Sequence, residues 1–156
     1  MDVPEYCYYQ MFNNYFEGYV TALTQAPELP ATSLTDYCYA SMFYGCTSLT
    51  QAPELLATSL ANGCYSSMFK NCTSLIQAPE LPATTLADYC YESMFYGCTN
   101  LNNINVSFTA WNPSDATLDW VSNVSSSGIF TCSADLPDTP RDGSHIPSGW
   151  TRADKQ

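Results

Sequence analysis

The sequence predicts an α/β repeat solenoid in which each 26-residue unit contributes one short strand and one short helix, with caps at both ends. The main observation is an internal repeat, because cysteine and the segments around it return every 26 residues. A period of roughly 20 to 50 residues is typical of a stacked array, in which each unit buries its apolar side against its neighbours. The two cysteine series are Cys38, Cys64 and Cys90, and Cys46, Cys72 and Cys98.

Each unit carries a pattern that predicts a short helix. Apolar residues recur every four positions, with aromatic residues beside them, which is typical of one broad apolar helix face. Ser33 is a candidate residue for the helix start, and Gly45 for its end. The recurring apolar residues of this unit are Leu34, Cys38, Met42 and Cys46.

A proline-containing segment precedes each predicted helix. The sequence of residues 23–29, Leu-Thr-Gln-Ala-Pro-Glu-Leu, returns at 49–55 and, with one change, at 75–81. Proline restricts itself and the residue before it to extended conformations. Each unit is therefore predicted to contain one short strand, a turn and one short helix.

The repeats are predicted to occupy residues 1–101. The first rung, residues 1–22, is irregular, because its Tyr-Cys-Tyr and Met-Phe pairs match those of the next rung at an offset of 31 residues instead of 26. This offset implies an inserted turn around residues 13–19. An atypical terminal rung is expected in a repeat array.

Residues 102–156 are predicted to form a C-terminal cap, because the sequence period fails after Leu101. Alternating apolar residues predict a strand over 101–108, and a second strand is predicted over 128–132. Residues 114–121 predict a short amphipathic helix between them. From Ser133 onward the composition predicts a loop-rich tail, with two apolar anchors at Ile146 and Trp150.

One block of each unit resembles a known repeat family. Residues 41–49, Ser-Met-Phe-Tyr-Gly-Cys-Thr-Ser-Leu, return nearly unchanged at 93–101, and this block resembles the BspA-like, or Treponema-type, bacterial leucine-rich repeats. The resemblance covers roughly residues 6–101. It implies a leucine-rich-repeat-type solenoid at the bacterial cell surface or outside the cell, with an adhesive or ligand-binding role. It implies no catalytic residues.

Charge and hydropathy exclude several classes of partner. Fifteen acidic residues against four basic ones give a net charge of −11, and no Lys or Arg precedes Lys70. Binding to a phosphate backbone requires clustered Lys or Arg, so nucleic acid is not an expected partner. No apolar run reaches the ~20 residues of a membrane span, and the first residues lack the order of a signal peptide.

No catalytic site, metal site or cofactor is predicted. His145 is the only histidine, and its place in the loop-rich tail predicts a mobile side chain and not a member of a Ser/His/Asp site. The chain has no glycine-rich phosphate loop, HExxH motif or paired CxxC motif. Helical spacing would keep the repeat cysteines too far apart for disulfides, so we expect eight reduced thiols that pack as small hydrophobic residues.

Tyrosines are the first candidate ligand-binding residues. Counting about 100° per residue places Tyr37 beside Tyr44 on the outer helix surface, and Tyr89 beside Tyr96. Aromatic side chains are enriched at interaction hot spots, although such rings can also merely shield the helix edges. Three other tyrosines are expected to pack at the edge of the core: Tyr39, Tyr65 and Tyr91.

A row of glutamates is the second candidate. Glu28, Glu54 and Glu80 occupy equivalent positions in consecutive units, so stacking would bring them about 4.8 Å apart. Like charges at that distance repel by roughly 1 kcal/mol in water. The three side chains either splay into salt-screened solvent, or they receive a basic partner or a cation such as Ca²⁺.

These observations leave two functions open. The first is a non-catalytic binding or adhesion module of a bacterial surface protein, with a protein or glycan ligand. The second is a structural spacer or terminal domain of a longer surface protein or phage appendage, without a ligand of its own. The extracellular or cell-surface location follows from the family resemblance alone.

Overall fold

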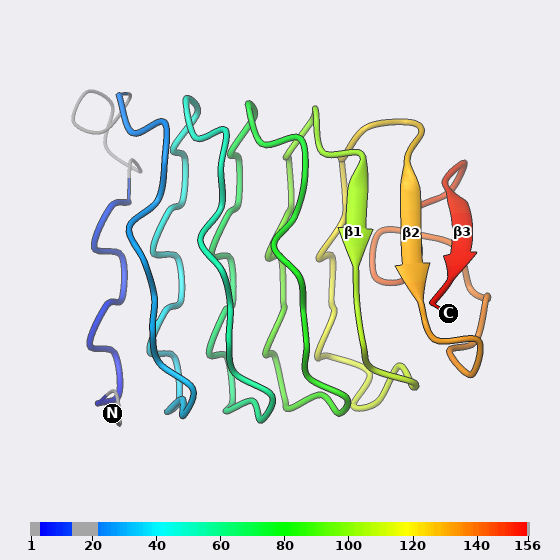
Figure 1. Cartoon of the computed structure of the whole chain (residues 1–156), viewed down its shortest axis with the longest axis horizontal. Coiled ribbons are helices and arrows are strands. Elements are labelled where there is room, and N and C mark those ends of the chain that lie inside the picture. Colours follow the sequence, from blue (N-terminus) through cyan, green and yellow to red (C-terminus); the bar gives the residue numbers. More distant parts are fainter. Residues whose placement is uncertain (1–3, 14–21, 156) are drawn as a thin grey trace.

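The computed structural model describes residues 4–13 and 22–155, and the chain over these residues forms a row of stacked rungs (Figure 1). Each rung has two layers, an extended segment and a segment made of consecutive turns. At the C-terminal end the extended layer becomes a parallel sheet in the order β1-β2-β3. Its strands are β1 (Asn103–Asn105), β2 (Ile129–Cys132) and β3 (Thr151–Asp154).

The predicted α/β fold with a helix in every unit is wrong, because no helix is present among the described residues. In an α-helix each amide N–H donates to the carbonyl four residues before it. Here the Cys38 N–H donates to the Thr35 carbonyl, three residues before, at 3.3 Å, whereas the Tyr39 N–H donates to Cys64 of the next rung at 3.0 Å. This alternation continues along residues 35–46, 61–72 and 87–98, which we call the turn ladders.

A left-handed residue at every fourth position produces the turn ladder. Tyr37, Ser41 and Gly45 have φ angles of 55°, 55° and 73°. Each is the third residue of a turn, the position at which a type II turn requires positive φ. These conformations interrupt helical winding, so Ser33 and Gly45 do not begin and end a helix, and alternate amides stay free to bond to the next rung.

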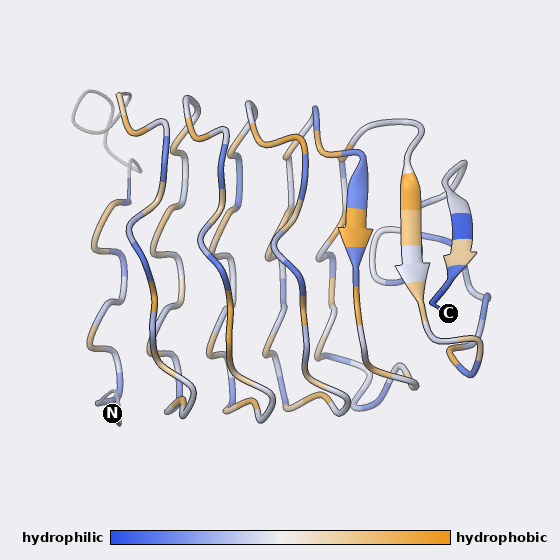
Figure 2. Ribbon diagram, viewed as in Figure 1, coloured by the Kyte–Doolittle hydropathy of each residue, from blue (hydrophilic) through white to orange (hydrophobic). Residues whose placement is uncertain are grey.

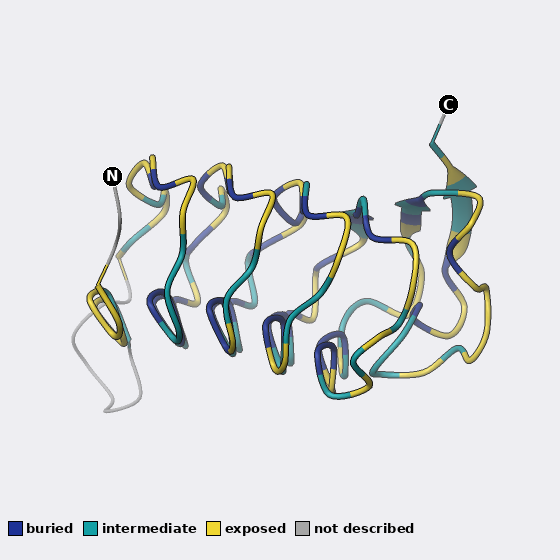
Figure 3. Cartoon of the chain, turned by 90° about the horizontal axis from the view of Figure 1, so that it is seen from below, coloured by how far each residue is buried: buried dark blue, intermediate teal, exposed yellow. Residues whose placement is uncertain are grey.

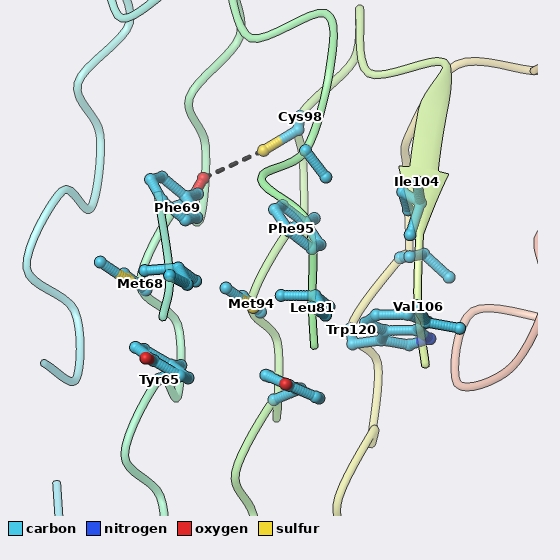
Figure 4. Packing of buried hydrophobic residues seen from close by; sticks show 14 of the residues in the cluster. Tyr65, Met68, Phe69, Leu81, Met94, Phe95, Cys98, Ile104, Val106 and Trp120 are labelled. Atoms are coloured by element: carbon cyan, nitrogen blue, oxygen red, sulfur yellow. Dashed lines mark hydrogen bonds between the residues drawn. The ribbon is translucent and has the colours of Figure 1, made fainter. Parts of the chain in front are cut away.

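The apolar side chains of the turn ladders form half of the core. Phe69 stacks between Phe43 and Phe95 with ring-centroid distances of 5.6 and 5.7 Å. The neighbouring methionines and the three inner tyrosines are also buried in rows (Figure 4), and the burial of these tyrosines confirms that they are packing residues. The remaining members of these rows are Met42, Met68 and Met94, and Tyr39, Tyr65 and Tyr91.

The extended layer forms the other half of the core. Leu29, Leu55 and Leu81 are buried between the two layers. Hydrophilic and hydrophobic residues alternate along these segments, and burial recurs at the same place in each rung (Figures 2 and 3). The predicted strand of each unit is reduced to single bridges such as Gln25 with Gln51, in segments whose prolines have no N–H to donate.

The stack continues beyond Leu101, although the residue types of the repeat change there. The Tyr91 N–H donates to the Ala116 carbonyl at 2.8 Å, so this segment accepts the bonds of the preceding rung. The predicted helix over residues 114–121 is therefore wrong, because this segment is a fourth turn ladder with positive φ at Asp119 and Asn123. The strands predicted at 101–108 and 128–132 correspond to β1 and β2.

The tail after Ser133 is more ordered than predicted. It contains β3, which pairs with β2, and it is anchored by the buried side chains of Ile146 and Trp150. Arg152 of β3 donates hydrogen bonds to the carbonyls of Ser133 and Leu136 at 2.9 and 2.8 Å. The loop-like composition did not reveal this strand, because the strand is held by pairing with β2 and by hydrogen bonds from Arg152 to carbonyls that are distant in the sequence.

The first rung is described over residues 4–13, where Tyr8 donates its N–H to Cys38 at 3.0 Å. The insertion predicted around residues 13–19 lies largely outside the described residues. None of the described segments is a helix long and apolar enough to cross a membrane.

Replacing Phe69 by Ala should lower the free energy of unfolding by about 3–5 kcal/mol, because its ring packs against neighbours on both sides. Urea denaturation followed by tyrosine fluorescence measures the change. The matched control is Leu56→Ala, whose side chain is 45% exposed and should cost less than about 1 kcal/mol. Equal losses for the two variants would contradict the packing of this row.

Ser67 distinguishes a turn ladder from a helix, because its φ is 55°. Ser67→Gly should leave stability unchanged or raise it by up to about 1 kcal/mol, since glycine adopts positive φ without strain. Ser67→Val should lower it by at least about 1 kcal/mol, since a β-branched residue is a strong outlier there. In a helix valine would be the better of the two, so thermal melts that rank Val above Gly would refute the turn ladder.

Candidate binding face

A groove runs along the outer side of the extended layer. Its larger part, of about 760 Å³, lies between residues 50–56 and residues 77–82, and a second part of about 430 Å³ lies between residues 25–30 and the same middle segment. The two parts share residues 51–54 and therefore lie next to each other across three rungs. We call this surface the acidic groove, because its lining includes Glu28, Glu54 and Glu80.

The acidic groove exposes backbone groups that an ordinary sheet would pair. The amide N–H groups of Glu54, Leu55 and Glu80 have no hydrogen-bond partner among the described residues. Prolines contribute to this, because Pro53 and Pro79 lack an N–H, and pairing in this layer is reduced to isolated bridges. Unpaired amides at the edge of an extended segment are ready donors for a ligand that lies alongside.

The three predicted glutamates all lie on this groove with exposed side chains. Glu80 already holds a cation from the chain itself, since the Lys155 Nζ lies 3.2 Å from its Oε1 atom. The same ammonium group donates to the Ser107 hydroxyl at 2.8 Å. A lysine from the C-terminal end is thus received by the last glutamate of the row, whereas Glu28 and Glu54 have no such partner among the described residues.

The calcium alternative has no preformed cage. Among the described residues, no three His, Cys, Asp or Glu side chains come together as a metal site. Ca²⁺ requires six to eight oxygen ligands, so an open row of carboxylates along a groove does not resemble its usual sites. A row of separate negative charges fits a partner with separate positive charges better.

The four predicted surface tyrosines lie in two rows, one with Tyr37 and Tyr89 and the other with Tyr44 and Tyr96. Tyr37 stacks on Tyr6 at a ring-centroid distance of 5.4 Å, whereas Tyr44 lies 6.0 Å from the Nζ atom of Lys70. The same Nζ atom lies 4.7 Å from the ring of Tyr96. Lys70 therefore bridges two tyrosines of different rungs by cation–π contacts, and these rings are partly occupied by the chain itself.

Tyr89 is the most exposed of the four tyrosines described above, at 40%. The negative charge of the Asp115 carboxylate raises the pKa of Tyr89. Tyr37 and Tyr89 occupy equivalent positions in the first and third turn ladders, where the middle ladder has Gly63. An added Cβ at Gly63 would lie 2.3 Å from the Tyr37 ring, so that glycine makes room for the tyrosine.

The cysteines are buried thiols, with the exception of Cys7 in the first rung. All eight are unpaired thiols, and seven of them are buried, which agrees with the expected reduced state. The Sγ–H groups of Cys72 and Cys98 donate to Phe43 and Phe69 of the preceding rung at 3.1 and 3.0 Å. Burial raises the pKa of Cys98 to about 12, so its nucleophilic thiolate form is rare near neutrality.

His145 is held in the cap, which corrects the expectation of a mobile side chain. Its Nδ1 atom lies 2.8 Å from the Asp142 carboxylate, and its ring packs against Trp111 at a centroid distance of 5.0 Å. The neighbouring Ser144 hydroxyl accepts the Asp119 N–H at 2.9 Å and is thus used in the backbone of the cap. These contacts give the histidine a structural place.

Comparison with known proteins identifies no relative: no family model, no curated protein and no solved structure matches the chain. The candidate site therefore rests on the geometry of the chain itself.

Stability should fall steeply above about pH 9, because burial raises the pKa of all six repeat cysteines, for example of Cys46 to about 11. The unfolded state loses these protons from about pH 9, whereas the folded state keeps them. A thiol whose pKa in the folded state is about 11, such as that of Cys46, therefore costs up to about 1.4 kcal/mol per pH unit between pH 9 and 11. Urea midpoints measured from pH 7 to 11 test this.

The control for this titration is Cys98→Ala, which should give a shallower loss of stability with pH than the unmodified chain. A midpoint that stays constant up to pH 11 would contradict the burial of the thiols.

Proposed function

We propose that this chain is a non-catalytic binding module that holds an extended, basic segment of a protein in the acidic groove. The observation that carries the proposal is Lys155, which occupies the Glu80 end of the groove, whereas the other two glutamates of the row have no cationic partner among the described residues. It supplies an example, within the chain, of the side chain that the remaining carboxylates would bind.

The backbone of the groove supports a protein ligand over a glycan. An extended peptide laid along a sheet edge gains affinity from main-chain hydrogen bonds, and its side chains give specificity. The free N–H groups of Glu54 and Glu80 supply donors for its carbonyls, and the carboxylates beside them attract Lys or Arg. With a net charge of −11 the whole molecule would also attract a basic partner from a distance.

The role at a bacterial surface is part of this proposal and is supported by the resemblance of residues 41–49 and 93–101 to BspA-like repeats. A binding module also accounts for the acidic groove, which a ligand-free spacer would not need. The ligand-free spacer is therefore the alternative function, and the experiment below can distinguish it from a binding module.

The test is the binding of a fluorescent ten-residue peptide that alternates Lys with Pro or Val, measured by anisotropy at low salt. The unmodified chain should bind it, and affinity should fall as salt rises, because screening weakens exposed charge pairs. The double variant Glu28→Gln/Glu54→Gln should bind at least about tenfold more weakly, a loss of about 1.4 kcal/mol. This double variant should remain folded, since both of its substituted side chains are exposed.

The matched control is Asp88→Asn/Asp135→Asn, which removes the same charge from exposed residues outside the groove lining. It should retain nearly full affinity. Equal weakening in both variants would mean that only net charge matters, and absence of binding to basic, acidic and neutral peptides alike would favour the spacer.

A further inference from the structure

The first rung ends the stack with an exposed apolar edge. Residues 6–12 form a shorter ladder of the same kind, which precedes the four turn ladders described above and which we call the N-terminal edge. Tyr6, Tyr9 and Met11 are 53%, 45% and 53% exposed, whereas Ala40 and Met42, the equivalents of Tyr9 and Met11 in the next rung, are buried. The end rungs of repeat proteins usually carry a polar outer face, so this edge has the character of an internal surface of the stack.

Hydrogen bonding makes the N-terminal edge directional. In the second rung the carbonyls of Cys38, Ala40 and Met42 accept N–H groups from the rung before. The equivalent carbonyls in the first rung belong to Cys7, Tyr9 and Met11 and have no partner among the described residues. The amides of these same residues are already bonded three residues back, so these three residues present a row of acceptors and no free amide donor.

The opposite end of the stack is closed within the chain. The last turn ladder offers the amides that would bond to a further rung, but Val121 donates to the Gly143 carbonyl at 2.9 Å. Asp119 likewise donates to the Ser144 hydroxyl at 2.9 Å. At these two positions a second copy of the chain therefore has no open donor to offer, and two N-terminal edges face to face would bring acceptors against acceptors.

We propose that the N-terminal edge is a docking surface for one further rung of the same repeat, which binds through the same backbone hydrogen bonds that link the rungs of this chain. Such a rung supplies N–H groups at every second residue, which matches the spacing of the three carbonyls. It also covers the outer faces of Tyr8 and Phe12, which among the described residues stack on Tyr39 and Phe43 alone. The proposal is independent of the acidic groove.

The test adds that rung and reads out Cys7, the exposed thiol among the eight. A copy of residues 33–60 is placed directly before Pro4, so that Cys7 takes the position that Cys64 holds in the natural stack. Within the copy, Cys38 becomes Ala and Cys46 becomes Val, the residues that the fourth turn ladder has at these positions. Iodoacetamide alkylation of the folded protein at pH 8 then reports on Cys7.

Docking should slow alkylation of Cys7 at least about 100-fold, because the reagent reaches the thiol only when the added rung detaches, and detachment costs a few kcal/mol of free energy, on the order of local unfolding. The melting temperature should rise by several degrees in one transition, since stability in repeat proteins grows with each neighbour interface. The control fusion carries Met42→Lys and Phe43→Asp in the copy, so that the added segment cannot pack, and its Cys7 should react as in the original chain.

Equal Cys7 rates in the two fusions would overturn the proposal. It would also be overturned if sedimentation of the unmodified chain showed a dimer that Met11→Asp dissolves, because the edge would then pair with a second copy.

Discussion

The hydrogen bond from every second amide of a turn ladder to the next rung is the interaction on which this structure depends. It exists because a left-handed residue at every fourth position, such as Ser41 or Ser67, keeps the chain from winding into a helix. These bonds hold neighbouring rungs at one spacing, and at that spacing the rings of Phe43 and Phe69 stack. The aromatic rows, the buried thiols and the extended layer all follow from this single spacing.

The sequence predicted the equivalent positions well and the backbone badly. The period of 26 placed Phe69 between Phe43 and Phe95 and put three glutamates on one face, because identical residues in a stack meet identical residues. The helix was wrong for a reason visible in the pattern. Apolar residues four apart drift by about 40° per step on a helix, whereas the spacing here stays at four over the whole segment.

Two further features were beyond the reach of the sequence pattern. The fourth turn ladder keeps the 26-residue spacing, but Ala116 and Trp120 replace the cysteine and methionine of the earlier rungs, so backbone stacking continues where side-chain identity ends. The groove could not be predicted, because it depends on which backbone amides beside Pro53 and Pro79 stay unpaired once the rungs have stacked. The row of glutamates could be read from the sequence, but the Lys155 contact with Glu80 joins residues 75 positions apart, and no local motif signals it.

The paired shapes of neighbouring rungs have a consequence for how such a chain evolves. The Tyr37 ring lies over Gly63, and Asn71 lies over Gly97, where an added Cβ would come within 2.2 Å of its side-chain oxygen. Units that look interchangeable are therefore matched to the neighbour that follows them. Loss of the third unit by recombination would set the Asn71 side chain against the Cβ of Asn123 in place of Gly97, so the steric fit at this position depends on the order of the repeats.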